Sequence, residues 1–509
     1  MKKILFLFLF IASIFLTSCS LFNNTKDVTS NLSSINVSPS TITTNTITPT
    51  FRPIITETSN LIPTTTTNLI PTTTKIDDEE KYYNDLFNLQ NKINIDINIS
   101  DEELKKINDD YMRNTYRMAD KVTITITYID NTSYVREIEE VGIRMKGNTS
   151  RTSFFDNKIY QNVHFKLSFD ETFDDENEYS ISERKIWANT FLRNERKART
   201  VFGLDGLEIK FNRENDASYS RDIYASYVYK KYGVLAQNMN LGTINFMNQN
   251  MDSNVDTLYK IYEPVDKYFI HRNFNKGLDD GDLYKATYGT SSGMPTLNQK
   301  DSSAYGINNE IYKNQKKITY DLKTNKKKSN HSMINNFLNW INSNENDLAN
   351  DLINYLDEDY FYTLMAIQYL TGDWDNFLYD SNNYYLYFND LGIAYFIPYD
   401  MDRCFGIQAK DHDMVSLSPT NYYNLQGDNN KSNLLIKTIF KNNSIAQEKY
   451  LNKLKEIASD ILNIDNFKDS VYDYIYDNYH NSYDISLGNK PENRNNAPES
   501  YFTQKIKLI

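Results

Sequence analysis

The sequence predicts an α+β protein in which a β-rich first part precedes a helical second part. Three observations support this prediction. Several short segments before residue 286 alternate apolar and polar side chains, as half-buried strands do. Residues 331–371 and 434–480 instead place their apolar side chains at helical spacing. The 40 Tyr and 27 Phe residues of the 509-residue chain supply the large side chains that a sizeable core requires.

The β-rich part is expected to begin with a helix and to continue as a series of strands. Ser100 and Glu103 form a capping box, which predicts a helix start, and the helix should extend to about Arg117. Asp130 and Asn131 then form the turn of a hairpin. The predicted strands cover residues 122–128, 134–145, 163–169, 207–211, 243–247 and 258–262.

Two further helices lie among or after these strands, and a last hairpin follows in the helical part. Asp216 is a suitable N-cap residue for a helix that closes at Gly233. Another helix is predicted from Val265 to about Phe274. The strands of the last hairpin cover residues 384–388 and 393–398.

The first residues are typical of a secretory signal. Lys2 and Lys3 precede an apolar run at residues 4–16, which is too short to cross a bilayer comfortably as a helix. The run leads into Leu-Thr-Ser-Cys19, which resembles the lipobox of bacterial lipoproteins. We therefore expect residues 1–18 to be a signal peptide and Cys19 to carry a lipid. This lipid would anchor the exported chain to the outer face of a bacterial membrane, at the cell surface. An ordinary cleaved signal with an incidental cysteine is the alternative.

Residues 19–76 are expected to form a disordered stalk. They are rich in Thr, Ser, Asn and Pro and contain a direct repeat at residues 60–67 and 68–75. Such a segment buries too little apolar surface to offset the entropy of the chain. After the stalk the composition becomes that of a globular protein. We expect a main domain at residues 77–480 and a C-terminal extension at residues 481–509.

Charge and cysteine content limit the partners and the covalent structure. The net charge is −12, and it becomes −14 once a signal peptide containing Lys2 and Lys3 is removed. An acidic protein of this kind is not expected to bind nucleic acid. The sequence has two cysteines, Cys19 and Cys404. Once Cys19 is acylated, no internal disulfide can form.

Two acidic clusters suggest a chemistry. Asp373 and Asp375 follow an apolar helix, Asp400 and Asp402 follow an apolar strand, and Asn383 lies between the clusters. Carboxylates at strand ends suit a divalent cation, and Mg²⁺ needs only one or two of them together with phosphates. A separate aspartate near a fixed asparagine suits a base for a hydroxyl nucleophile. Either cluster alone is more often a turn or a cap, but the two together favour phosphoryl transfer.

Seven segments resemble the CotH kinase family, which is named after a spore-coat protein, and they occur in the order found in that family. The resemblance covers most of residues 95–480. The segments are residues 143–150 (Ile-Arg-Met-Lys-Gly-Asn-Thr-Ser), 164–169 (His-Phe-Lys-Leu-Ser-Phe), 216–221, 262–266 (Tyr-Glu-Pro-Val-Asp), 281–285 (Gly-Asp-Leu-Tyr-Lys), 375–383 and 397–402 (Ile-Pro-Tyr-Asp-Met-Asp).

The resemblance implies a two-lobed protein-kinase-like fold. Its β-rich N-lobe would cover about residues 95–286 and its helical C-lobe about residues 287–480. It also implies an atypical protein kinase that binds ATP with Mg²⁺ or Mn²⁺. Such an enzyme would phosphorylate Ser or Thr of surface or secreted proteins.

The resemblance also assigns roles to individual residues. Asp375 would be the catalytic aspartate, and Asn383 would help to hold a second metal or to fix the catalytic loop. Asp400 would bind the metal ion, with Asp402 beside it. Glu263 would be the glutamate that pairs with the nucleotide-binding lysine.

The nucleotide-binding lysine is the open assignment. Many family members have adjacent lysines just before the strand at residues 163–169, where this chain has Gln-Asn-Val. Lys166 is the nearest candidate on the strand, and Lys158 is the alternative. Gly147 and Asn148 would cover the phosphates with backbone N–H groups.

Two other functions remain open at this point. The first is a catalytically inert kinase-like protein used for adhesion or as a surface coat. The missing lysine pair favours this reading, as does Asp373 in place of the asparagine common in the family. The retention of Asp375, Asp400 and Glu263 argues against it. The second is a metal-dependent glycosyltransferase in which Asp400-Met-Asp402 is the Asp-x-Asp motif. That fold would place βαβ units before the motif, where this sequence predicts helices.

Overall fold

The computed structural model describes residues 74–148, 150–156, 159–248, 257–299, 301–343, 348–407, 413–422, 433–441, 443–489 and 496–509. The expected signal peptide, Cys19, nearly all of the stalk and Lys158 lie outside these residues. Within the described ranges, no helix combines the length and apolar character needed to cross a membrane.

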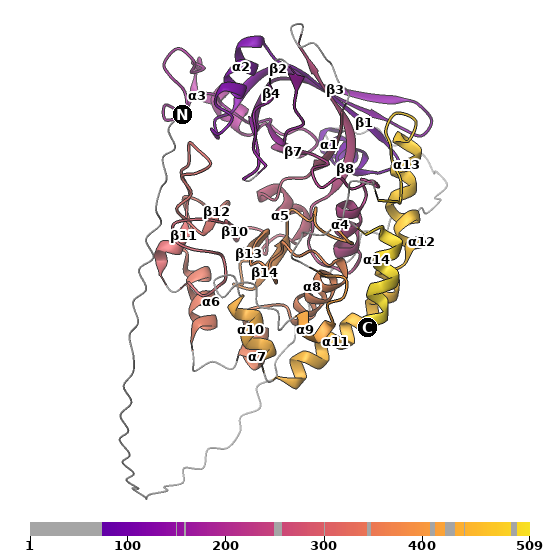
Figure 1. Cartoon of the computed structure of the whole chain (residues 1–509). Helices are drawn as coiled ribbons and strands as arrows, with labels where there is room; N and C mark the ends of the chain where they lie inside the picture. Colours follow the sequence, from indigo (N-terminus) through magenta and orange to yellow (C-terminus); the bar gives the residue numbers. More distant parts are fainter. Residues whose placement is uncertain are drawn as a thin grey trace, which may run out of the picture. The chain divides into compact units, whose positions relative to one another are not determined.

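Seven strands of the first part close into a barrel in the order β1-β2-β3-β6-β7-β9-β8 (Figure 1). The ring is closed by a parallel pair, β1 with β8, while the other neighbours are antiparallel. The barrel strands are β1 (Lys92–Asn98), β2 (Arg117–Thr127), β3 (Ser133–Met145), β6 (Phe165–Ser168), β7 (Gly206–Phe211), β8 (Met239–Met247) and β9 (Thr257–Tyr262). A separate two-stranded pair consists of β4 (Phe155–Asp156) and β5 (Ile159–Tyr160).

The barrel interior is a hydrophobic core of its own. Ile93, Ile95 and Ile97 alternate along β1 and are completely or almost completely buried. The other barrel strands contribute to the same cluster in the same way, because successive side chains of a strand point to opposite faces. Charged residues at the intervening positions therefore project out of the barrel.

Five helices accompany the first part, and α4 connects it to a second core. α4 directly follows β7, and nearly all of its side chains are buried. Its apolar residues belong to the larger of the two hydrophobic clusters, not to the barrel interior. The five helices are α1 (Thr74–Phe87), α2 (Asp101–Asp109), α3 (Thr190–Lys197), α4 (Arg221–Lys231) and α5 (Lys267–Asn273).

A second sheet forms the centre of the remaining structure. Its strand order is β11-β12-β10-β13-β14, so β10, which follows α5, pairs with the much later β13. The hairpin β13–β14 is buried along both strands, as expected for a sheet covered on both faces. The strands are β10 (Asp282–Ala286), β11 (Tyr305–Gly306), β12 (Tyr320–Leu322), β13 (Tyr384–Phe388) and β14 (Ala394–Pro398).

Helices surround this second sheet (Figure 1). α8 is buried on every side, which is characteristic of a central helix. The α-helices are α6 (Ser332–Asn342), α7 (Leu348–Asp351), α8 (Glu358–Thr371), α9 (Pro419–Tyr422), α10 (Leu434–Phe440), α11 (Ser444–Ile461), α12 (Ile464–Phe467), α13 (Asp473–Tyr479) and α14 (Pro498–Lys505). Shorter turns are the 3₁₀ segments Ser302–Ala304, Leu352–Asn354 and Ile506–Leu508 and a π-helical turn at Lys468–Tyr472.

The C-terminal residues pack against the loops that follow α8 and β14. Tyr501 Oη of α14 donates a 3.0 Å hydrogen bond to the carbonyl of Leu370 near the end of α8. Arg221 Nη1 donates to the carbonyls of Phe405 and Asn496, at 2.7 Å each. The start of α4, the turn after β14 and the C-terminal segment are thus joined through a single guanidinium group.

The α+β class is confirmed, but two local predictions are wrong. The helix that begins with the Ser100 cap ends at Asp109, and Arg117 is already the first residue of β2. Strand pairing with β3 outweighs the helical pattern there. Asp216 does not cap α4. Its carboxylate binds the backbone and side chain of Arg221 and fixes the preceding loop. The closure of the barrel was not predicted.

Candidate active site

The candidate site begins on the outer surface of the barrel, where charged residues occupy paired positions on neighbouring strands. Arg144, Lys166 and Glu208 are paired across β3, β6 and β7. Two residues further along β7, Lys210 is paired with Lys260 of β9. These positions alternate with residues of the barrel core, so their side chains project outward. The row contains four cations and a single glutamate.

Glu208 is the centre of a hydrogen-bonded group that joins the barrel to the turn after β14. Its Oε2 lies 2.5 Å from Lys146 Nζ and accepts a 3.0 Å hydrogen bond from Tyr399 Oη. Burial acts to raise the pKa of Glu208, but Lys146, Lys166 and other lysines hold it well below its ordinary value. Burial lowers the pKa of Lys146 to about 8, although Glu208 opposes this effect. A buried carboxylate therefore stays ionised among several lysines.

Lys210 and Asp400 make a second contact between the barrel and this turn. Lys210 Nζ lies 2.5 Å from Asp400 Oδ1. The lysine side chain is 6% exposed and that of Asp400 36% exposed. Burial acts to raise the pKa of Asp400, but Lys210 and Lys146 outweigh it and lower the pKa. Asp400 is thus an ionised carboxylate that is held by a buried lysine and still accessible from outside.

Three residues near the hairpin β13–β14 have left-handed backbone conformations. The φ angles are 49° at Ser381, 51° at Asn383 and 59° at Asp400. Asparagine tolerates this region better than most residues, but each such position still costs about 1–3 kcal/mol. The backbone N–H of Tyr399 donates to the carbonyl of Asn383 at 3.0 Å, which ties the two ends of the hairpin together. Backbone strain of this kind is concentrated at functional sites.

Asp375 is held in the loop that follows α8. Gly372 ends this helix with a φ of 63°. Asn382 Nδ2 donates to Asp375 Oδ1 at 2.9 Å, and Asn383 Nδ2 donates to the Asp375 carbonyl at 2.8 Å. Of the two asparagines, Asn382 therefore contacts the carboxylate, and the predicted Asn383 fixes the backbone of the loop.

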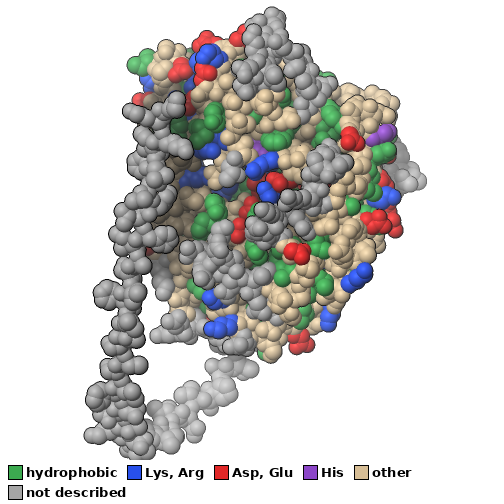
Figure 2. Space-filling model, viewed as in Figure 1, with side chains coloured by type: hydrophobic (Ala, Val, Ile, Leu, Met, Phe, Trp, Pro, Cys, Tyr) green, Lys and Arg blue, Asp and Glu red, His purple; other side chains and the backbone are tan. Residues whose placement is uncertain are grey.

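Repulsion among four aspartates marks the centre of the site. Burial raises the pKa values of Asp373, Asp375 and Asp402, and neighbouring aspartates raise them further. For Asp375, the hydrogen bond from Asn382 and, more weakly, a nearby arginine act in the opposite direction. Basic and acidic side chains meet near the middle of the face shown in Figure 2. A bound cation would relieve this repulsion among the carboxylates.

The donors present fit a divalent cation that is bound together with phosphates. In the part of the chain that the structure describes, no group of three or more His, Cys, Asp or Glu side chains could hold a metal ion by itself. Mg²⁺ does not require such a group, because one or two carboxylates and the oxygens of a nucleotide suffice. Asp400 is ionised and accessible, and it is close enough to Asp375 to raise the pKa of that residue. These two carboxylates meet the requirement.

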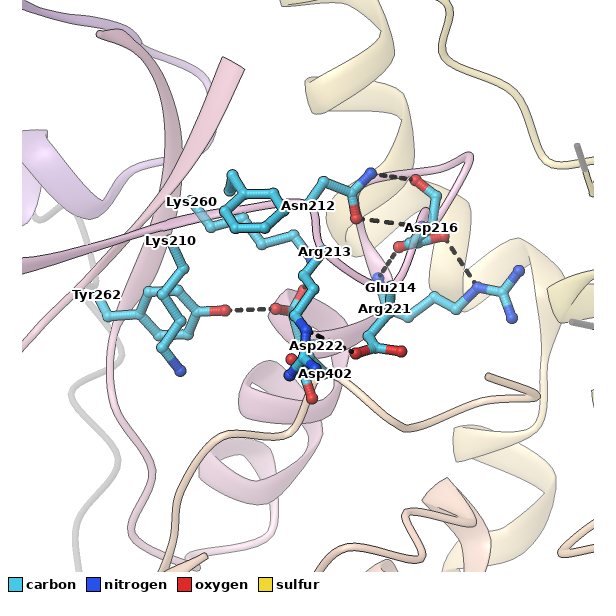
Figure 3. Close-up of a pocket in the computed structure, with 11 residues that line it drawn as sticks. Lys210, Asn212, Arg213, Glu214, Asp216, Arg221, Asp222, Lys260, Tyr262 and Asp402 are labelled. Carbon is cyan, nitrogen blue, oxygen red and sulfur yellow. Dashed lines mark hydrogen bonds and ion pairs between the residues drawn. The ribbon is translucent and has the colours of Figure 1, made fainter. Parts of the chain in front are cut away.

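Asp402 lines a small pocket between β7, β9 and α4 (Figure 3). At the start of α4, Asp222 accepts hydrogen bonds from Lys260 Nζ at 2.7 Å and Tyr262 Oη at 2.6 Å. Lys210 lines the same pocket, which has room for about one water molecule. Asp402 thus lies beside a buried polar cluster, whereas Asp400 contacts Lys210 directly.

Gly147 and Asn148 follow β3 immediately after Lys146. Gly147 has a φ of 105°, and a Cβ at this position would clash with Ser150 Oγ, so glycine is required. The carbonyl of Asn148 accepts a 2.6 Å hydrogen bond from Lys313 Nζ of the segment between β11 and β12. The predicted phosphate-covering loop therefore begins next to a lysine of the site.

Comparison with known proteins identifies the family. Residues 143–483, which are well over half of the chain, match the model of a family described as CotH kinase protein. The chain belongs to the CotH kinase protein family. Among curated proteins, spore coat protein homolog 1 of Rhizopus delemar is 28% identical over 122 residues, which are 23% of this chain and 19% of that protein. The matched segment thus spans about a fifth of that relative's length.

In this CotH kinase family member, Glu263 forms its ion pair with an arginine and not with the expected nucleotide-binding lysine. Glu263 is completely buried and binds Arg272 of α5, with 2.5 Å between Oε1 and Nη2. Among the described residues, Lys166 has no carboxylate within ion-pair distance, and Glu208 beside it on β7 binds Lys146 instead. The reason is positional, because Glu263 directly follows β9 and its carboxylate is held by Arg272 of α5 and by Asn238.

Sequence reasoning did not single out Lys146, Glu208 and Lys210, which the structure brings to the site. In β7, Glu208 and Lys210 alternate with Leu207, Ile209 and Phe211. Such alternation is the ordinary pattern of an antiparallel strand with one solvated face. The sequence alone therefore did not distinguish this face, and it is the burial of Glu208 and Lys210 in the structure that does. Lys146 directly precedes the glycine of the predicted phosphate loop.

Proposed function

We propose that this chain is an extracytoplasmic, lipid-anchored atypical protein kinase. It transfers the γ-phosphate of ATP to Ser or Thr residues of surface or secreted proteins. Membership of the CotH kinase family supports the chemistry. The secretory signal and the lipobox-like residues before Cys19 support the location.

The contact between Lys210 and Asp400 is the observation that carries this proposal. In protein kinases a lysine on a strand and an aspartate after a later hairpin both serve the phosphates, the aspartate through a metal ion. Lys210 lies on β7, the strand that precedes α4 in the chain, and Asp400 follows the hairpin that begins after Asp375. This is the chain order of the corresponding parts of a protein kinase.

The residues of the site have separate roles in the proposed reaction. Asp375 orients the acceptor hydroxyl and takes its proton while the hydroxyl oxygen bonds to the γ-phosphorus. The bond from this phosphorus to the oxygen bridging to the β-phosphate breaks, and ADP leaves. Lys146 and Lys210 bind phosphate oxygens through charge-assisted hydrogen bonds. Asn382 and Asn383 keep Asp375 in position.

Asp400 would hold the divalent cation. Asp402 lies two residues further along the chain, and Asn383 is brought close by the hydrogen bond between its carbonyl and the N–H of Tyr399, so both could assist. When bound, Mg²⁺ or Mn²⁺ neutralises charge on the nucleotide phosphates. The protein contributes an ionised, accessible carboxylate at a backbone position fixed by its left-handed conformation.

Mass spectrometry of the purified full chain tests the proposal. After incubation with ATP and Mg²⁺ or Mn²⁺, we expect phosphate on Ser or Thr residues of the chain itself. Hydrolysis of nucleotide sugars without turnover of ATP would instead indicate a glycosyltransferase. A chain that neither binds ATP nor gains phosphate would be an inert kinase-like surface protein.

A further inference from the structure

Lys285 lies in the middle strand of the second sheet and faces the turn after β14. In β10 it is paired with Asp321 of β12 and Tyr385 of β13. Its Nζ lies 4.3 Å from the centroid of the Tyr399 ring and 5.4 Å from that of Tyr385. Because Tyr399 directly precedes Asp400, Lys285 is close to the candidate metal ligand in space, although it is far from it in the sequence.

Three ammonium groups surround the ring of Tyr399. The Nζ atoms of Lys146 and Lys210 both lie 5.0 Å from the ring centroid, and that of Lys285 lies 4.3 Å from it. Lys146 and Lys210 come from the barrel, whereas Lys285 comes from the second sheet. Cations this close repel each other, so the group is stable only with nearby negative charge.

Lys285 differs from the other two lysines in its counter-charge. Lys146 is paired with Glu208, and Lys210 is paired with Asp400. Among the residues that the structure describes, no carboxylate lies within ion-pair distance of Lys285. Of these three lysines, Lys285 is therefore the one to which the described residues supply no partner of opposite charge.

The surroundings of Lys285 make its charge costly. Burial, together with Lys146, Lys323 and Lys316, lowers the pKa of Lys285 to about 7, although Glu208 acts in the opposite direction. Lys285 is half-buried, and an ammonium group that is partly withdrawn from water without a partner of opposite charge destabilises a folded protein. A bound anion at this position would remove that cost.

We propose that Lys285 binds the polyphosphate chain of the nucleotide from the second sheet, opposite Lys146 and Lys210 of the barrel. This inference rests on the proposed nucleotide site and names a residue and a ligand class within it. The ligand class is a nucleoside di- or triphosphate, since three ammonium groups match the negative charge of a polyphosphate chain better than the smaller charge of a monophosphate. Binding of such a ligand would also link the barrel to the second sheet.

Calorimetric titration of the purified full chain tests this assignment. The ligands are ATP with Mg²⁺, AMP and inorganic tripolyphosphate, and the variant is Lys285→Met, which keeps the length of the side chain and removes its charge. We expect binding of ATP and of tripolyphosphate to weaken at least tenfold, which is the usual loss for a charged hydrogen bond, and binding of AMP to change less than threefold.

Lys267→Met is the matched control. Lys267 Nζ also lies over a tyrosine ring, 4.6 Å from the centroid of Tyr268, but it is exposed at the start of α5. All three ligands should bind to this variant as they bind to the wild type. Lys285→Arg keeps the charge, and it should bind tripolyphosphate within a few-fold of the wild type even if Lys285→Met folds poorly.

The outcomes separate this inference from the proposed function. Wild-type affinity of Lys285→Met for both ATP and tripolyphosphate overturns the assignment of Lys285 and leaves the kinase proposal intact. A wild type that binds tripolyphosphate through Lys285 but does not bind ATP contradicts the kinase proposal and the nucleotide as ligand, and it leaves only the contact of Lys285 with a polyphosphate. A wild type that binds neither ligand contradicts both. Equal losses for AMP and ATP would place Lys285 away from the phosphate chain and also overturn the assignment.

Discussion

Asp375 and Asp400 lie on opposite sides of the hairpin β13–β14, so one can serve the acceptor hydroxyl while the other serves the metal. Asp375→Asn should lower phosphate incorporation by roughly two to four powers of ten, the usual contribution of a general base. Binding of ATP with metal should largely survive. Incorporation at the wild-type rate would show that Asp375 is not the base.

Asp373→Asn, which restores the residue common in the family, should keep or raise activity in the same assay.

Asp400→Asn should weaken binding of ATP in the presence of metal. A neutral amide is a poorer ligand for Mg²⁺ or Mn²⁺ than a carboxylate, and Lys210 would lose its counter-charge. The measurement is the shift of the thermal midpoint with ATP and metal, because a ligand that binds the native state raises this midpoint. An equal shift in wild type and variant would exclude Asp400 from the site.

The ion pair between Glu263 and Arg272 is expected to act on stability and not on phosphoryl transfer. Glu263 is fully buried, and Arg272 connects it to α5. Glu263→Gln should lower the free energy of unfolding by about 3 kcal/mol, a typical cost of breaking a buried pair. The affinity for ATP with metal should stay within about twofold of the wild type. A large loss of affinity in a stably folded variant would restore Glu263 to the nucleotide site.

At the scale of elements, the end of α8 shows how the C-terminal helix supports the loop that carries Asp375. Gly372 has a left-handed backbone, and a Cβ at this position would collide with the hydroxyl of Tyr501 on α14. The glycine therefore allows both the turn and the contact between the two helices. This contact lies three residues before Asp375.

Gly372→Ala and Gly233→Ala together measure that contact. Both glycines have positive φ, but nothing lies within 4 Å of a Cβ at Gly233. Gly233→Ala should cost about 1 kcal/mol of unfolding free energy, the price of a left-handed alanine. Gly372→Ala should cost about 3 kcal/mol in denaturant titrations, because overpacking is added. Equal losses of unfolding free energy in the two variants would show that Tyr501 of α14 does not pack tightly against Gly372.

At the scale of the whole molecule, the proposed attachment to a membrane depends on Cys19, which lies outside the described residues. Cys19→Ser should remove the acylation site and leave either uncleaved precursor or unanchored protein. A lipidated cysteine with two or three acyl chains binds a membrane far more firmly than one with a single chain. Fractionation of cells, with the processed mass of each form, gives the measurement. A Cys19→Ser protein that is processed normally and still sediments with membranes would contradict the lipobox interpretation.

The sequence by itself determined the α+β class, most strands and the two acidic clusters, because these depend on local periodicity and on residues close together in the chain. It placed Asp375, Asn383 and Asp400 around one hairpin, and the structure places them there as well.

Only the tertiary structure decided which lysines reach those carboxylates. Lys146 directly follows β3, Lys210 lies in β7 and Lys285 lies in β10. They meet at Tyr399 because the barrel and the second sheet pack against each other. Strand pairing over long separations, such as β1 with β8, leaves no local pattern in the sequence. Burial and neighbouring charges then set the partner of each lysine, and these depend on the folded environment.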